Sequence, residues 1–140
     1  MTGRVIGGNL NTMSAMWGST YMPEIQEGDL LLIEDSLKDI AIVERLLAML
    51  KLNGIFDRIG ALIVGKHELL KDQGTGRCTL DVLHEVLNGQ DLPIIYDFDC
   101  CHTHPMYTIP IGAQLTIDFD AQSISILGEM NSQATLAPKT

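Results

Sequence analysis

The 140-residue chain is poor in several features, and each shortage excludes a class of protein. Basic residues are few: nine Lys and Arg stand against eighteen Asp and Glu, giving a formal net charge of −9. Such an acidic surface repels polyanions, so we expect neither nucleic acid nor an anionic membrane as a partner. No apolar run approaches the ~20 residues of a membrane-spanning helix. The first residues, Met1 to Arg4, carry no apolar core of a signal peptide, so we expect a cytoplasmic protein.

Cysteine is also scarce, with three in the chain and two of them adjacent, Cys100 and Cys101. Three cysteines do not make a disulfide framework, and a bond between neighbours would close a strained ring, so reduced thiols are predicted. Apolar residues, in contrast, make up 46% of the chain, while charged residues make up 19%. This balance excludes a disordered chain and predicts one globular domain with a substantial core.

The hydrophobic pattern predicts an α/β fold. Continuous apolar runs are typical of strands buried on both faces, apolar residues at helical spacing predict the helices between them, and two late segments alternate like an antiparallel hairpin. The predicted strands are 30–34, 59–64, 94–98, 113–119 and 123–127, and the predicted helices are 12–17, 40–50 and 79–88. This order indicates a mostly parallel central sheet with crossover helices, plus an antiparallel layer.

A histidine in a proline-rich turn is the strongest candidate for chemistry. His102 lies in the segment 100–112, which contains Pro105 and Pro110 and follows a predicted strand. A rigid backbone is what a general base needs to hold its ring in place. Another predicted strand ends at Glu34, at the edge of the sheet where α/β proteins build their sites. A histidine and a carboxylate are two of the three members of a Ser-His-acid triad.

These residues also permit other interpretations. His102 could simply be a hydrogen-bonded loop histidine, and Glu34 or Asp35 could cap the helix that follows, which is the favoured role for Asp35. Cys100, His102 and His104 carry zinc-binding side chains, although ligands at alternate positions of a strand diverge and rarely meet at one ion. The residues alone favour neither interpretation of His102, as a general base or as a hydrogen-bonded loop histidine.

The sequence offers no convincing nucleophile to complete a triad with His102 and Glu34. None of the serines lies in a strand-to-helix elbow of the Gly-x-Ser-x-Gly kind. Cys101 adjoins His102, but neighbouring side chains on an extended strand point apart. The serines considered are Ser14, Ser19, Ser36, Ser123, Ser125 and Ser132.

Several motifs, taken in order, resemble the LD-carboxypeptidase family, which includes the microcin self-immunity peptidases. They are Gly7-Gly8-Asn9-Leu10, Gly18-Ser19-Thr20-Tyr21, Leu32-Ile33-Glu34-Asp35, Val43-Glu44-Arg45, Gly65 and the run from His102-Thr103 through Pro105 to Pro110-Ile111-Gly112. The resemblance runs from about Gly3 to Leu127 and concerns only the family's C-terminal domain. The sequence of the His102 segment is closer to the microcin-immunity branch than to the murein-recycling branch.

The resemblance implies a swivelling β/β/α three-layer domain whose partner is a flavodoxin-like N-terminal domain that carries the nucleophilic serine. It also implies that Glu34 and His102 are the acid and the base of a Ser-Glu-His triad. One departure concerns Cys101, because the family usually has glycine before the histidine. Glycine adopts backbone angles that cysteine resists.

The expectations that follow are specific. Residues 1–130 form the C-terminal domain, residues 131–140 form a loose tail, and the N-terminal catalytic domain is the missing partner. The substrate is an LD-peptide of murein or a peptidyl- or aminoacyl-nucleotide, no cofactor or metal takes part, and the domain is a homodimer. This chain alone is expected to be inactive. Two rival hypotheses are a metal-binding module built on Cys100, His102 and His104, and a non-catalytic domain that dimerises.

Overall fold

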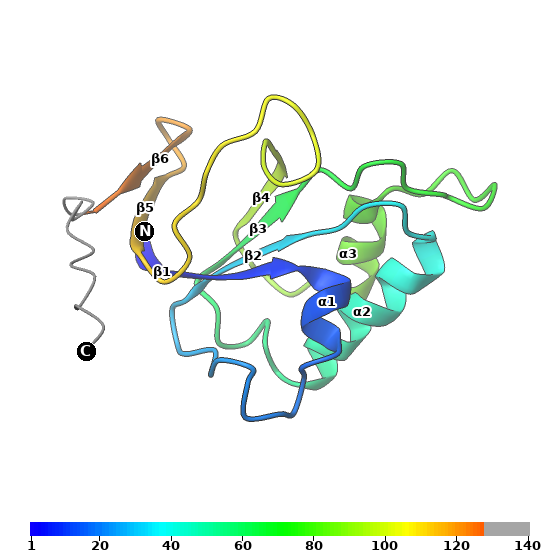
Figure 1. The fold of residues 1–140 in the computed structure, drawn as a ribbon, viewed down its shortest axis with the longest axis horizontal. Coiled ribbons are helices and arrows are strands. Elements are labelled where there is room, and N and C mark those ends of the chain that lie inside the picture. The colour runs from blue at the N-terminus through cyan, green and yellow to red at the C-terminus, as the bar shows by residue number, and fades with distance from the viewer. Residues whose placement is uncertain (128–140) are drawn as a thin grey trace, which may run out of the picture.

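The computed structural model describes residues 1–127, in which a curled six-stranded sheet carries helices on one face (Figure 1). The elements, in order, are β1 (Thr2–Asn9), α1 (Leu10–Ser14), β2 (Leu30–Glu34), α2 (Ile40–Leu52), β3 (Ala61–Gly65), α3 (Thr79–Leu87), β4 (Ile94–Phe98), β5 (Gln114–Asp118) and β6 (Ser123–Ile126). The predicted tail, 131–140, lies outside the described residues. Within them, no helix is long and apolar enough to cross a membrane.

The sheet has the strand order β4-β3-β2-β1-β5-β6. β1 to β4 are parallel, β5 pairs antiparallel with β1, and β6 pairs antiparallel with β5. The mixed α/β fold predicted from the pattern is therefore confirmed, including the late hairpin. The hairpin extends the central sheet through β1, and the curl of the sheet turns it over one face, as Figure 1 shows at the end nearest the N-terminus.

Strand alternation divides the apolar residues between two cores. Leu31 and Ile33 of β2 face α2 and α3, whose buried residues follow the helical period. Leu30 and Leu32 face the opposite side, where they pack with residues of β1, β3 and β5. Because both faces of β2 are covered, all five of its residues are buried, as the continuous apolar run predicts.

The strand β1 was not predicted, and its glycines explain why. Two adjacent glycines, Gly7 and Gly8, weaken the strand pattern in the sequence. Gly7 has a φ of 127°, and a Cβ built there would lie 1.9 Å from the carbonyl oxygen of Leu32. Only glycine therefore allows β1 to approach β2 this closely. Both glycines therefore serve the sheet.

The helix caps also differ from the prediction. Asp39 caps α2 by accepting the N–H of Ala41 with its side chain, and the helix begins at Ile40 as predicted. Asp35 is thus not the cap of α2. Asn9 caps α1, which begins two residues earlier than predicted because this side chain accepts the N–H of Thr12.

Candidate active site

The site lies where neighbouring parallel strands end at one edge of the sheet. Asn9 at the end of β1 is in register with Glu34 at the end of β2. Gly65 ends β3, one residue beyond the pair formed by Ile33 and Val64. Asn9, Glu34 and Gly65 thus form a row across three strands, and strand alternation places them on the same face. This is the face opposite the helices.

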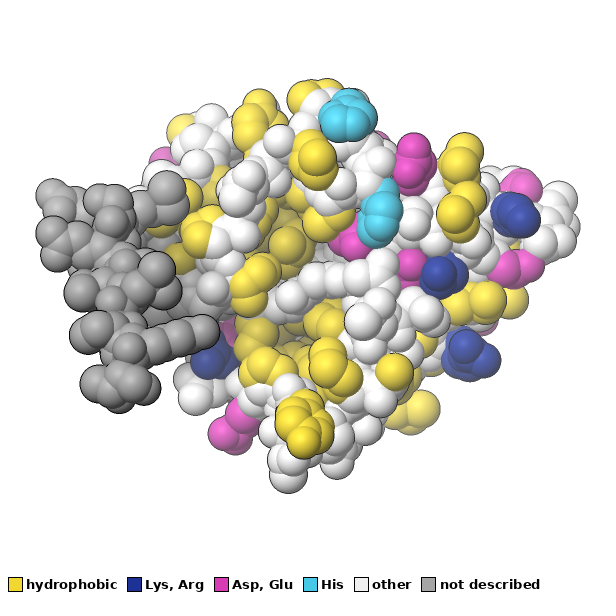
Figure 2. Space-filling model, viewed as in Figure 1, with side chains coloured by type: hydrophobic (Ala, Val, Ile, Leu, Met, Phe, Trp, Pro, Cys, Tyr) yellow, Lys and Arg dark blue, Asp and Glu magenta, His cyan; other side chains and the backbone are white. Residues whose placement is uncertain are grey.

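The structure brings Glu34 and His102 together, although 68 positions separate them in the sequence. Nδ1 of His102 lies 2.7 Å from Oε2 of Glu34, a distance typical of a charge-assisted hydrogen bond in which the ring N–H donates. The Glu34 side chain is 3% exposed, whereas that of His102 is 48% exposed. A buried carboxylate therefore orients an imidazole whose other edge faces outward. Figure 2 shows histidine side chains at the surface of this face with acidic side chains close by.

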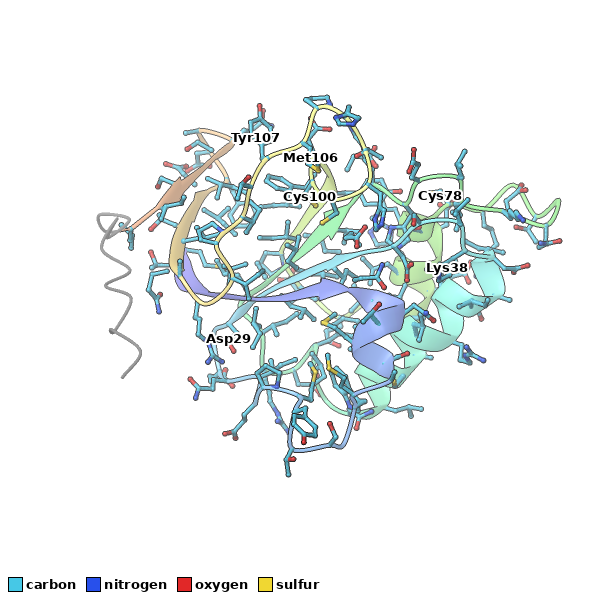
Figure 3. The ribbon with its side chains drawn as sticks, in the orientation of Figure 1. Asp29, Lys38, Cys78, Cys100, Met106 and Tyr107 are labelled. Carbon is cyan, nitrogen blue, oxygen red and sulfur yellow. The ribbon has the colours of Figure 1, made fainter. Side chains whose placement is uncertain are left out.

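A closed loop between β4 and β5 holds His102 in place. At its base, Asp99 forms an ion pair with Lys66, which follows β3. The N–H of Tyr107 donates to the carbonyl of Asp99 over 3.0 Å, and the Tyr107 ring packs 6.3 Å from the ring of Phe98, centre to centre. Figure 3 shows Cys100 between this loop and the sheet. The loop is thus fixed to β3 and β4, so its backbone positions the imidazole.

Cys101 occupies the position where the family usually has glycine, and its backbone confirms the concern raised by the sequence. Its φ is 64°, in the left-handed region that L-residues other than glycine, asparagine and aspartate seldom adopt. The turn before His102 therefore keeps a glycine-like conformation despite the cysteine. Strained residues of this kind are common at active sites, where the surrounding structure holds them.

The electrostatics of the pair favour a protonated imidazole. The hydrogen bond from His102 to Glu34, together with the charge of that carboxylate, raises the pKa of His102 above its ordinary value. Among the described residues no group hydrogen-bonds Nε2 of this ring. Nε2 is therefore the nitrogen that is free to accept a proton from a nucleophile and to return it to a leaving group.

The cysteines beside His102 and two of the serines in the described part of the chain show no activation as nucleophiles. Burial raises the pKa of the Cys100 thiol to about 12, and partial burial also raises the pKa of Cys101, so both thiols are protonated near neutral pH. The hydroxyls of Ser14 and Ser19 donate to backbone carbonyls of their own segment. Among residues 1–127, no serine hydroxyl hydrogen-bonds His102.

The metal-binding arrangement of Cys100, His102 and His104 is not formed. Cys100 is 1% exposed and packs in the apolar core opposite the helices, while His102 is directed to Glu34. Within residues 1–127, no three His, Cys, Asp or Glu side chains are grouped as metal ligands.

Two polar residues at the site were missed by the sequence reasoning. Asn9 caps α1 with its side-chain oxygen, and its amide nitrogen also hydrogen-bonds the Glu34 carboxylate. His67, just after β3, hydrogen-bonds the carbonyl of Gly65 through Nδ1, its Nε2 is buried without a partner among the described residues, and burial lowers its pKa. His67 could be found from its place shortly after a predicted strand, whereas Asn9 could not, because the strand that it ends is not predicted.

A separate apolar groove of about 720 Å³ lies between β4 and the β5–β6 hairpin. Phe98, Tyr107, Ile109, Ile124 and Ile126 are among the residues that line it, whereas Glu34 and His102 are not. The groove is therefore distinct from the acid–base pair.

Comparisons with known proteins identify the family of this chain. The model of the LD-carboxypeptidase C-terminal domain matches residues 2–117. The chain is 58% identical over 124 residues to the microcin C7 self-immunity protein MccF of Escherichia coli, covering 89% of this chain and 36% of that protein. It is 59% identical over 126 residues to a putative carboxypeptidase of Vibrio cholerae, covering 90% of this chain and 38% of that one.

Solved structures give the same result. MccF in complex with aspartyl sulfamoyl adenosine superposes with a TM-score of 0.89 at 56% identity, over 92% of this chain and 38% of that one. A muramoyltetrapeptide carboxypeptidase from Oxalobacter formigenes superposes with a TM-score of 0.74 at 28% identity, over 90% of this chain and 45% of that one.

The fold and these matches define the class: this chain belongs to the LD-carboxypeptidase family and corresponds to its C-terminal domain. Within that family it is similar to the microcin C7 self-immunity protein MccF. The chain spans 36–38% of the length of these curated relatives.

Proposed function

We propose that this chain supplies the acid–base half of a serine carboxypeptidase, with His102 as the general base and Glu34 as the residue that orients it. The observation that carries the proposal is the 2.7 Å contact between Oε2 of Glu34 and Nδ1 of His102, which leaves Nε2 open to the surface. The serine comes from a nucleophile-bearing domain outside this chain. Membership of the LD-carboxypeptidase family supports this division.

The proposed reaction uses the pair twice. Nε2 of His102 accepts the serine proton as the serine oxygen attacks the carbonyl carbon, and the Glu34 carboxylate stabilises the imidazolium that forms. His102 then gives this proton to the nitrogen of the leaving group, so that the C–N bond breaks and an acyl-enzyme remains. Water attacks the acyl-enzyme, His102 accepts a proton from the water and returns it to the serine oxygen.

For the substrate, we propose the amide bond between an amino acid and a nucleotide-like group, as in a processed microcin. Identity of 58% to a microcin self-immunity protein, against 28% to a muramoyltetrapeptide carboxypeptidase, supports this choice. The solved structure of that self-immunity protein with aspartyl sulfamoyl adenosine supports it further. An LD-peptide of murein is the second substrate class, since the family name refers to such bonds.

A chimera tests the catalytic roles. This chain replaces the matching 36% of the E. coli protein, and hydrolysis of aspartyl sulfamoyl adenosine is followed by chromatography. We expect the chimera to be active and His102→Ala to lower its kcat by about 10²- to 10⁴-fold, the usual contribution of a general base. His84→Ala, which removes an exposed histidine of α3, is the matched control. A His102→Ala chimera as active as the parent chimera would refute the proposal.

The chain by itself is proposed to have no peptidase activity, because a base without a nucleophile cannot form the acyl-enzyme. Turnover of aspartyl sulfamoyl adenosine or of an LD-tetrapeptide by the purified chain would contradict this. A cytoplasmic location and a homodimeric state, both expected in the analysis of the sequence, are also proposed. Sedimentation velocity of the purified chain tests the dimer.

A further inference from the structure

The amide of Asn9 sits between two buried carboxylates. Its Nδ2 donates to Oε1 of Glu34 over 3.1 Å and to Oδ1 of Asp35 over 3.2 Å. Glu34 and Asp35 are 2% and 1% exposed, so both depend on hydrogen-bond donors from the protein. One amide nitrogen therefore serves two carboxylates at the end of β2.

The orientation of this amide is fixed from its other end. Oδ1 of Asn9 accepts two hydrogen bonds from Thr12, one from the backbone N–H and one from the side-chain hydroxyl, each over 2.9 Å. An amide turned by 180° would present its NH₂ group to the N–H of Thr12 and its oxygen to two carboxylates. The network thus determines which atom is Nδ2.

The two oxygens of Glu34 then have separate partners. Oε1 accepts from Asn9 and Oε2 accepts from His102. Because a carboxylate is planar, holding one oxygen on each side sets its rotation about the last side-chain bond. Asp35 is held in turn, since its Oδ2 accepts the N–H of Asn11 over 2.9 Å, its Oδ1 accepts the N–H of Ser36 over 2.9 Å, and Lys38 lies 3.4 Å away.

We propose that Asn9 is a positioning residue of the acid–base pair, which holds the Glu34 carboxylate in the plane where Oε2 receives the Nδ1–H of His102. This inference deepens the proposed function and rests on it. Its chemical consequence concerns the tautomer of the neutral ring. With the proton on Nδ1, the lone pair of Nε2 faces outward and can accept a proton, whereas the other tautomer cannot act as that base.

The effect of Asn9 can be separated from its role as a helix cap. Asn9→Ser keeps a good cap for α1 but removes the NH₂ group that reaches Glu34 and Asp35. Asn11→Ala is the matched control, because Asn11 contacts Asp35 through its backbone N–H, which alanine retains. Nitrogen-15 NMR of the 140-residue chain reports which ring nitrogen of His102 carries the proton.

We expect the parent chain and Asn11→Ala to show neutral His102 mainly as the Nδ1–H form. In Asn9→Ser the population shifts toward the Nε2–H form, and the pKa of His102 falls toward its ordinary value as the carboxylate turns away. An unchanged tautomer in Asn9→Ser, with or without a fall in the pKa of His102, would overturn the proposal. Because this measurement needs no turnover, it remains decisive even if His102→Ala proves the catalytic role wrong.

Discussion

Gly65 is the position where one added methyl group should disturb the site most directly. A Cβ built at Gly65 would lie 2.8 Å from Cβ of Glu34 and 2.8 Å from Sγ of Cys100. Carbon atoms in favourable contact are about 3.5–4.0 Å apart, so the methyl group of Gly65→Ala is about 1 Å too close to two neighbours at once. Both neighbours are buried, at 2% and 1% exposure, and have little room to move.

The size of the effect follows from two opposing terms. Overpacking a core costs about 1–3 kcal/mol. Replacing glycine by alanine lowers the conformational entropy of the unfolded chain, which stabilises the folded state by about 0.4–1 kcal/mol where the backbone permits alanine. The φ of Gly65 is not in the left-handed region, so the second term applies. We therefore expect Gly65→Ala to lower the free energy of unfolding by about 1–2 kcal/mol.

Urea unfolding followed by circular dichroism measures this loss. With an m-value of about 1–3 kcal/mol/M, the midpoint should fall by roughly 0.3–2 M. A second variant separates the two contacts: in a Cys100→Ala background, Gly65→Ala should cost less, because only the contact with Glu34 remains. We also expect Gly65→Ala to lower the pKa of His102, because it displaces Glu34, and this fall should persist in the Cys100→Ala background. Equal stability of Gly65→Ala and the parent chain, with an unchanged His102 pKa, would refute the steric argument.

Two further predictions concern Glu34 and Cys101, the residue that precedes His102. Glu34→Gln should lower the pKa of His102, measured by NMR titration, and should reduce stability more at pH 5 than at pH 8. The reason is that Glu34 raises the pKa of His102 in the folded chain, so its stabilisation is fully present below the unfolded-state pKa of about 6.5 and is lost as pH rises through the folded-state value. Cys101→Gly should be more stable than Cys101→Ala by about 1 kcal/mol, because only glycine adopts a φ of 64° without strain.

Each of these two predictions has a result that contradicts it. For Glu34→Gln, a stability loss that is the same at both pH values would show that the carboxylate does not favour the imidazolium. For Cys101, both variants lack the thiol, so their difference reports the backbone alone. An alanine variant as stable as the glycine variant would mean that the turn does not hold this residue in the left-handed region.

Much of the fold could be predicted because it depends on local patterns. The continuous apolar runs of β2 and β4 and the helical spacing in α2 follow directly from burial, and each lies within two residues of its predicted position. β1 was missed because its glycines lower its strand propensity. Glycine is needed there because β1 passes close to Leu32, a residue more than 20 positions later in the chain. A prediction from neighbouring residues cannot include that contact.

The sequence by itself determined that the chain is an acidic α/β domain, that His102 and Glu34 were its candidate base and acid, and that no serine elbow accompanied them. Tertiary structure alone decided that the carboxylate and the ring meet at 2.7 Å, that Cys100 turns into the core, and that Asn9 and Gly65 flank Glu34. The physical reason is strand register. Parallel strands bring residues from distant parts of the chain into one row, and this alignment depends on the packing of the whole sheet.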